Sequence, residues 1–388
     1  MPMSTTAPPP PLGQSIRGAA LAFRGYNLTN LGRTPELLAH PAYHAIIVEE
    51  LRRYSDLCAE ATGTSVDLAA AVRQRLEFGL QRYTEAVALV VAVESAQLRL
   101  LHEVHGIDFR QAKLAFGYSL GEIMAVACSG AIGAEDLVRV PLELARDCAE
   151  LAHDATLAIV FSRGRAIAES EMRRLCAEVT AEGRGTIGVS SVLSPNSYLV
   201  VGQGETTSRF KAAIEHAIPG VHVRPNDGRW PPLHTPIVRQ RCVPDRAAVR
   251  LETLPVGPMA PQPGIVSLVT GRRDYDPVTV RETLRNWVDH PQRLWDAVCE
   301  TLAADCKLVL HVGPEPNVIP ATFTRLATDV RQQTGGRTWE SYGKRAISSL
   351  ARRPWLAAVL PARIALLRAP FIQQINLEDW LLDHAPAG

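Results

Sequence analysis

Apolar and polar positions recur along the chain with two different periods, which predict a mixture of strands and helices. Short apolar runs of strand length occur at 18–23, 112–116 and 307–312, and a further run at 264–269 ends at a Thr-Gly pair. Between residues 84 and 104 the apolar positions recur with helical spacing and end near Gly106. This pattern predicts a long, largely buried helix between strands of a large α/β domain.

The middle of the chain predicts a smaller unit with its own element order. Between residues 155 and 227 the pattern predicts two helices, at 169–180 and 206–217, and four strands, at 157–161, 186–192, 198–201 and 221–224. The resulting order βαββαβ is typical of a ferredoxin-like subdomain. We therefore expect a large subdomain formed by 14–154 and 228–335, with the small subdomain of 155–227 inserted into it.

The two ends of the chain differ from the body. Residues 1–13 contain four consecutive prolines, and we expect a disordered leader there. Residues 336–388 are apolar but interrupted at Pro354, Pro361 and Pro370, which forbids one continuous helix. Two interpretations of this extension stay open: short helices packed on the body, or a surface for a partner or a membrane, suggested by Arg352, Arg353, Arg363 and Arg368.

The composition argues against several classes of function. The 388 residues carry 41 Lys and Arg against 40 Asp and Glu, and a net charge of +1 argues against binding nucleic acid over a whole face. The chain contains no membrane span of about 18–20 apolar residues and no signal-peptide pattern, so we expect a cytoplasmic protein. Seven cysteines without a C-x-x-C pair indicate neither a disulfide framework nor a metal site.

The strongest chemical signal is Gly117-Tyr-Ser-Leu-Gly121. A serine between glycines at i−2 and i+2, after a strand and before a helix, fits a strained turn that exposes the hydroxyl of Ser119. The helix that follows would present its first N–H groups beside that hydroxyl. The motif also occurs by chance, and a plain loop serine is the alternative.

A histidine that could act as the general base lies further along the chain. His234 stands in a proline-stiffened loop, Trp230-Pro-Pro-Leu-His-Thr-Pro236, just after the small subdomain. The chain returns to the large subdomain at this point, which favours a place beside the nucleophile. Other histidines, such as His311 on a predicted buried strand, are interpreted as structural.

Five motifs, in order, resemble those of the malonyl-CoA:acyl-carrier-protein transacylase family, which includes the acyltransferase domains of fatty-acid and polyketide synthases. The segment 116–140 (FGYSLGEIMAVACSGAIGAEDLVRV) is similar to the family's nucleophile segment, and 230–238 (WPPLHTPIV) to its histidine segment. The segments 192–205, 263–272 and 308–319 resemble three more of its motifs. The resemblance covers about residues 18–330.

The resemblance implies a fold, a reaction and a set of residues. The fold is an α/β-hydrolase-like large subdomain with a parallel sheet, an inserted ferredoxin-like subdomain and, here, a C-terminal helical extension. Ser119 would take the acyl group from acyl-CoA, and His234 would take the hydroxyl proton. The backbone N–H groups of Leu120 and Tyr26 would bind the oxyanion. The acyl group would pass to the phosphopantetheine thiol of an acyl carrier protein, with no permanently bound cofactor.

The departures from the family pattern concern the acyl pocket. Tyr26 replaces a glutamine in the first loop, and Leu144 stands where malonyl-type enzymes carry an arginine. A one-residue ambiguity puts Asn286 or Trp287 in place of a downstream glutamine. We expect a pocket for a neutral acyl group, unless Pro141 shifts the helix and brings Arg139 or Arg146 inward. The expected pocket residues are Tyr118, Leu144, Leu233, Asn286 and Trp287.

Three functions of different classes stay open at this point. The first is an acyltransferase that loads a carrier protein in polyketide, fatty-acid or related biosynthesis. The second is a hydrolase on the same scaffold that removes acyl groups from carriers. The third is a catalytically weak scaffold subunit, suggested by the altered first loop.

Overall fold

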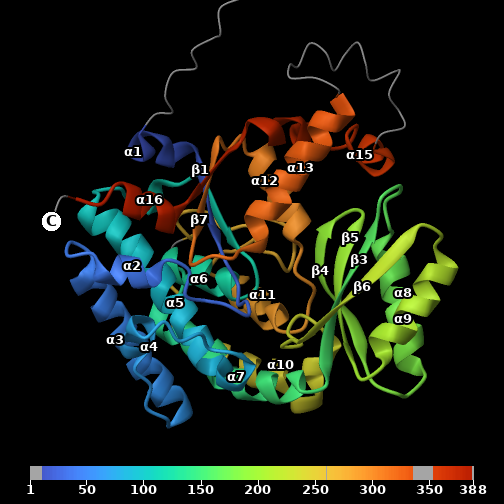
Figure 1. Ribbon diagram of the computed structural model, residues 1–388, viewed down its shortest axis with the longest axis horizontal. Helices are drawn as coiled ribbons and strands as arrows, with labels where there is room; N and C mark the ends of the chain where they lie inside the picture. The colour runs from blue at the N-terminus through green and yellow to red at the C-terminus, as the bar shows by residue number, and fades with distance from the viewer. Residues whose placement is uncertain (1–10, 259, 335–352, 387–388) are drawn as a thin grey trace, which may run out of the picture.

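A four-stranded parallel sheet lies at the centre of the larger part of the computed structural model, which describes residues 11–258, 260–334 and 353–386 (Figure 1). The strands follow the order β2-β1-β7-β8, and each neighbouring pair is parallel. Their bounds are Leu114–Gly117 for β2, Ala19–Phe23 for β1, Leu308–Val312 for β7 and Gln373–Asn376 for β8. The carboxyl ends of β1, β2 and β7 therefore meet at one edge of the sheet, where open α/β folds place their sites.

Strand β1 is buried on both faces, as its continuous apolar run predicts. Its odd-numbered side chains join one core with helices α3 (His44–Thr62) and α5 (Tyr83–Arg99). Its even-numbered side chains join a second core with α12 (Leu294–Ala303) and α13 (Val318–Thr334). Successive side chains of a strand point to opposite faces, so one strand anchors both layers of helices.

A separate four-stranded antiparallel sheet forms the smaller unit, with its two helices at the outer side of the molecule (Figure 1). The sheet order β4-β5-β3-β6 and the chain order βαββαβ are those of a ferredoxin-like fold, which confirms the predicted element order. The elements are β3 (Ala155–Ser162), α8 (Glu169–Ala181), β4 (Ile187–Ser194), β5 (Ser197–Gln203), α9 (Thr206–Ala217) and β6 (Val221–Arg229).

The predicted strand at 264–269 is wrong. Only Ile265 forms a bridge, to Ala115 of β2, and the chain then turns. The buried carboxylate of Glu122 accepts hydrogen bonds from the hydroxyl of Ser267 at 2.7 Å and from the N–H of Leu268 at 3.0 Å. These backbone and side-chain donors are satisfied by Glu122 instead of a neighbouring strand, which explains an apolar segment without strand geometry.

The ends of the chain also differ from the prediction. The leader was expected to reach residue 13, but helix α1 (Leu12–Ser15) begins within it and Leu12 is buried. Residues 1–10 lie outside the described residues. At the other end, the extension contains α15 (Pro354–Val359), a 3-10 helix (Ile364–Phe371) and α16 (Leu377–Asp383). It also contributes strand β8 to the central sheet, so it is not purely helical.

Three arginines of the extension are bonded to the body of the protein. Arg353 contacts Asp329 at 2.7 Å, and Arg363 contacts Asp296 at 3.1 Å. Arg368 donates to the carbonyl of Leu302 at 2.7 Å. Arg352 and the rest of 335–352 lie outside the described residues. Within the described residues, no helix has both the length and the apolar character needed to cross a membrane.

Candidate active site

Ser119 occupies a tight turn between β2 and helix α6 (Leu120–Cys128). Its backbone has φ +55° and ψ −117°, a strained conformation for a residue with a side chain. A Cβ atom on Gly117 would lie 2.0 Å from the backbone of Gly121, and one on Gly121 would lie 2.3 Å from the carbonyl oxygen of Phe23. Both glycines are therefore required for the turn to close against strand β1.

His234 lies beside Ser119, in the loop between β6 and the 3-10 helix Pro236–Arg241. Its Nε2 atom is 2.8 Å from the Oγ atom of Ser119, and its Nδ1 atom is 2.7 Å from the carbonyl oxygen of Trp287. A carbonyl oxygen only accepts, so Nδ1 carries the proton and Nε2 accepts from the serine hydroxyl. A backbone carbonyl thus orients the imidazole, with no carboxylate in that position.

Burial keeps this imidazole neutral. His234 is 3% exposed, and the loss of hydration lowers its pKa to about 4, partly opposed by the Trp287 carbonyl and the charge of Asp289. A neutral imidazole with a free Nε2 lone pair is the form that can accept a proton. The pair therefore has the geometry and the protonation state of a nucleophile with its base.

The backbone of Ser119 is held from the end of helix α11 (Val280–Trp287) and from the segment after it. Gln292 accepts the N–H of Ser119 at 3.0 Å through its Oε1 atom, and the Trp287 indole N–H donates to the Ser119 carbonyl at 2.9 Å. Gln292 is fully buried, and its backbone pairs with Ser190 and Val192 of the small subdomain. Gln292 could not be identified from the sequence, because no local motif indicates which distant backbone group a glutamine reaches.

The first loop, after β1, lies against the nucleophile turn. A Cβ on Gly25 would lie 2.5 Å from the carbonyl oxygen of Tyr118 and 3.1 Å from the Cβ of Ser119. Tyr26, the next residue, packs its ring edge-on against Tyr83 with centroids 4.7 Å apart. On the other side of Ser119, Leu120 is the first residue of α6, so its N–H has no partner within the helix.

Arg24 holds this first loop in place through several hydrogen bonds. Its buried guanidinium donates to the side chain of Asn30 at 2.9 Å, to the carbonyl of Gly25 at 2.8 Å and to the carbonyl of Pro314. Its backbone N–H donates to Glu94 at 3.0 Å. Burial lowers the pKa of Arg24 to about 10, so the side chain remains charged at neutral pH.

A small cavity opens beside Ser119 between α5, α6 and helix α7 (Ala134–Ala152), and we call it the acyl cavity. Its volume is about 10 Å³, roughly the room that one water molecule requires. It is lined by Tyr83, Val87, Ser119, Leu120, Pro141, Leu144, Ala145, Cys148, Leu233 and Trp287.

The expected pocket residues separate into two groups. Leu144, Leu233 and Trp287 line the acyl cavity, whereas Tyr118 and Asn286 are not among the described residues that line it. Tyr118 faces Ser191 of the small subdomain, and burial raises its pKa to about 12. Asn286 is half-buried one position before Trp287 on α11, which turns its side chain by about 100° around the helix.

The described lining of the acyl cavity is uncharged at neutral pH. Burial raises the pKa of Cys148 to about 12 and that of Tyr83 well above its ordinary value, so both groups keep their protons. The two arginines of α7 that could have replaced the missing cation point elsewhere. Arg139 contacts Glu60 at 2.6 Å, and Arg146 is exposed on the outer side of the helix.

Comparisons with known proteins agree with this architecture. No protein-family model and no curated protein matches the chain. Among solved structures, a malonyl-CoA:acyl carrier protein transacylase from Xanthomonas oryzae is 20% identical, with a TM-score of 0.60 over 79% of this chain and 90% of that one. The chain has the fold of the malonyl-CoA:acyl carrier protein transacylases.

Two further structures with this transacylase fold come from polyketide biosynthesis. A malonyl-transacylase in complex with its type II acyl carrier protein is 23% identical, with a TM-score of 0.60 over 78% of this chain and 91% of that one. The acyltransferase domain from module 8 of the salinomycin polyketide synthase is 21% identical, with a TM-score of 0.61 over 79% of this chain and 67% of that one. The predicted α/β fold with two sheets is thereby confirmed.

Proposed function

We propose that this protein is an acyltransferase that moves an acyl group from acyl-CoA to the phosphopantetheine thiol of an acyl carrier protein. The observation that carries the proposal is the contact of 2.8 Å between His234 Nε2 and Ser119 Oγ, with the imidazole oriented by the Trp287 carbonyl. The transacylase fold around this pair supports an exchange of thioesters through an acyl-serine.

The reaction would proceed in two balanced halves. In the first, Ser119 Oγ attacks the thioester carbonyl while His234 Nε2 takes the hydroxyl proton, and CoA leaves with a proton returned by His234. In the second, the carrier thiol gives its proton to His234 and attacks the acyl-serine, and Ser119 recovers its proton. The backbone N–H groups of Leu120 and Tyr26 would bind the oxyanion in both halves.

The cavity supports a neutral acyl group in preference to malonyl. A carboxylate buried beside the acyl-serine needs a cationic partner, and an unpaired buried charge costs about 3–5 kcal/mol. Leu144 provides no charge, and Arg139 and Arg146 lie outside the described lining. Apolar walls instead favour methyl and methylene groups by about 0.8 kcal/mol each.

The first loop argues for an active enzyme and against a scaffold without activity. The hydrogen bonds of Arg24 hold the loop against the nucleophile turn, although the sequence of the loop departs from the family pattern.

In the C-terminal extension, the bonds of Arg353, Arg363 and Arg368 to the body support a packing role for these arginines. The proposed carrier contact does not depend on them.

Intact-protein mass spectrometry after exposure to a panel of acyl-CoAs tests the proposal. We expect an acyl adduct on the wild type, no adduct on Ser119→Ala, and an unchanged adduct on Ser129→Ala, a buried serine at the end of the same helix. Addition of a carrier protein should then move the acyl group to it. Release to water at the same rate without a carrier would assign the hydrolase instead, and an adduct on Ser119→Ala would refute both.

A further inference from the structure

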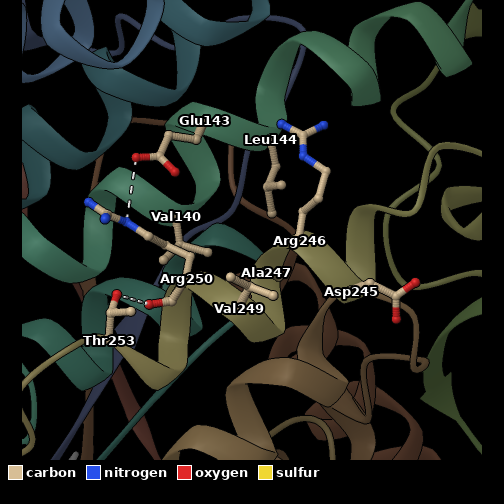
Figure 2. Close-up of a pocket in the computed structure, with 9 residues that line it drawn as sticks. All are labelled: Val140, Glu143, Leu144, Asp245, Arg246, Ala247, Val249, Arg250 and Thr253. Carbon is tan, nitrogen blue, oxygen red and sulfur yellow. Dashed lines mark hydrogen bonds and ion pairs between the residues drawn. The ribbon is translucent and has the colours of Figure 1, made fainter.

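A second, larger hollow lies beside helix α7. It opens between α7 and helix α10 (Val243–Glu252), has a volume of about 440 Å³, and is drawn in Figure 2. We call it the outer hollow. It is lined by Val140, Glu143, Leu144, Asp245, Arg246, Ala247, Val249, Arg250 and Thr253.

Of the described residues that line the two spaces, Leu144 is the only one common to both. It is 4% exposed, and in Figure 2 its side chain lies in the middle of the outer hollow's lining. Leu144 therefore contacts both the acyl cavity, of about 10 Å³, and a space of about 440 Å³.

The lining of the outer hollow combines apolar side chains with paired charges. Val140 and Ala247 are buried apolar residues at its floor, and Val249 is 71% exposed at its side. The two arginines are already paired, Arg246 with Asp147 and Arg250 with Glu143 at 3.5 Å. Because both arginines are paired and Asp245 adds a further negative charge, the described lining offers no unpaired cation that would select a carboxylate.

We propose that Leu144 limits the length of the acyl group on Ser119, by closing the acyl cavity to all but acetyl-sized groups. This proposal rests on the proposed function. With Leu144 shortened, the cavity joins the outer hollow, and the terminal methylene groups of a longer neutral acyl chain lie against Val140 and Ala247. The residue that replaces the family's arginine thus determines chain length.

Acyl-serine formation from equimolar acetyl-, butyryl-, hexanoyl- and octanoyl-CoA tests this role, with intact mass as the readout. The wild type is expected to carry mainly acetyl. In Leu144→Ala the ratio of octanoyl to acetyl adduct should rise at least about tenfold, the gain from roughly two further buried methylene groups.

The matched control is Leu142→Ala, which removes the same atoms from a buried leucine of the same helix. Leu142 lines neither the acyl cavity nor the outer hollow among the described residues, so its ratio should stay at the wild-type value. If Leu144→Ala does not fold, Leu144→Val removes less volume and should shift the preference toward butyryl.

The outcomes separate the two proposals. The length limit would be overturned if folded Leu144→Ala and Leu144→Val kept the wild-type ratio of octanoyl to acetyl adduct. The proposed function would remain intact in that case, because acetyl would still be loaded on Ser119. An equal shift in Leu142→Ala would also overturn it, because general loosening of the helix would then be the cause. If the wild type forms no adduct with any of the four thioesters, the proposed function itself fails.

Discussion

The two sides of Ser119 are built by different means. On the polar side, every polar group of the serine has a partner: His234 at the hydroxyl, Gln292 at the N–H, and both the Trp287 indole and the Glu122 N–H at the carbonyl. On the apolar side, the acyl cavity is enclosed by side chains of helices packed together, Leu144 among them. Hydrogen-bond geometry therefore controls the first side and side-chain volume controls the second.

Because of this difference, the rate of reaction and the choice of acyl group depend on different residues. A hydrogen bond requires particular atoms at about 2.7–3.0 Å, so few residues can serve on the polar side. A cavity wall requires only a shape and an absence of charge, so one substitution can change what it admits without disturbing the reacting atoms. We expect variants on the polar side to change rates, and variants on the apolar side to change which acyl group is loaded.

The largest effect should come from the base. His234→Ala is expected to slow acyl-serine formation by about 10²–10⁴, because no neutral imidazole remains to take the Ser119 proton. Quenched-flow sampling with mass detection measures the rate. His311→Gln is the control, since His311 is also buried with its pKa lowered to about 4, but it lies on β7 and contacts Gln374. A near-normal rate in His234→Ala would mean that the polar side does not supply the base.

A charge on the apolar side should come next. Leu144→Arg is expected to raise the ratio of malonyl to acetyl adduct by about 10–100-fold, the effect of a charge-assisted hydrogen bond to the substrate carboxylate. Competition between the two thioesters measures the ratio. Val249→Arg adds the same charge at the exposed outer hollow and should leave the ratio unchanged. Dominant malonyl loading by the wild type would remove the contrast between the two sides.

Gln292 should have a smaller effect on rate. Gln292→Met keeps the shape but removes the acceptor for the Ser119 N–H, which leaves a buried donor unsatisfied at a cost of about 1–3 kcal/mol. We expect kcat to fall about tenfold with KM for acyl-CoA unchanged. Gln292→Glu retains an acceptor oxygen and should recover part of kcat. Equal losses in both variants would indicate that Gln292 only fills space and does not position the nucleophile.

The pH profile should show the smallest change. The pKa of His234 is lowered to about 4, so its base form persists when the pH falls below the ordinary imidazole value of about 6.5. Acyl-serine formation at pH 5.5 is expected to stay within about twofold of the rate at pH 7.5, provided circular dichroism shows the same fold. An imidazole with the ordinary pKa would lose about tenfold over this interval.

Much of the fold could be predicted because its helices and strands follow from the local spacing of apolar and polar residues. The βαββαβ order of the small subdomain follows from alternating periods, and each predicted element there is found within a few residues of its place. The segment 264–269 could not be predicted correctly, because the Ser267 hydroxyl and the Leu268 N–H bond to Glu122, which is more than 140 residues away. Strand β8 was missed because its Gln373–Asn376 sequence is polar and its partner β7 is distant along the chain.

The sequence by itself determined the nucleophile turn, since Gly117 and Gly121 permit a close approach that no other residue allows. It also indicated His234, through the order of the motifs. Only the tertiary structure decided that Trp287 and Gln292 hold the serine backbone, and that Leu144 lines both the acyl cavity and the outer hollow while Tyr118 and Asn286 face elsewhere. The backbone conformation of a turn depends on residues that are adjacent in the sequence. The contacts of a side chain depend on helices that come together from distant parts of the chain.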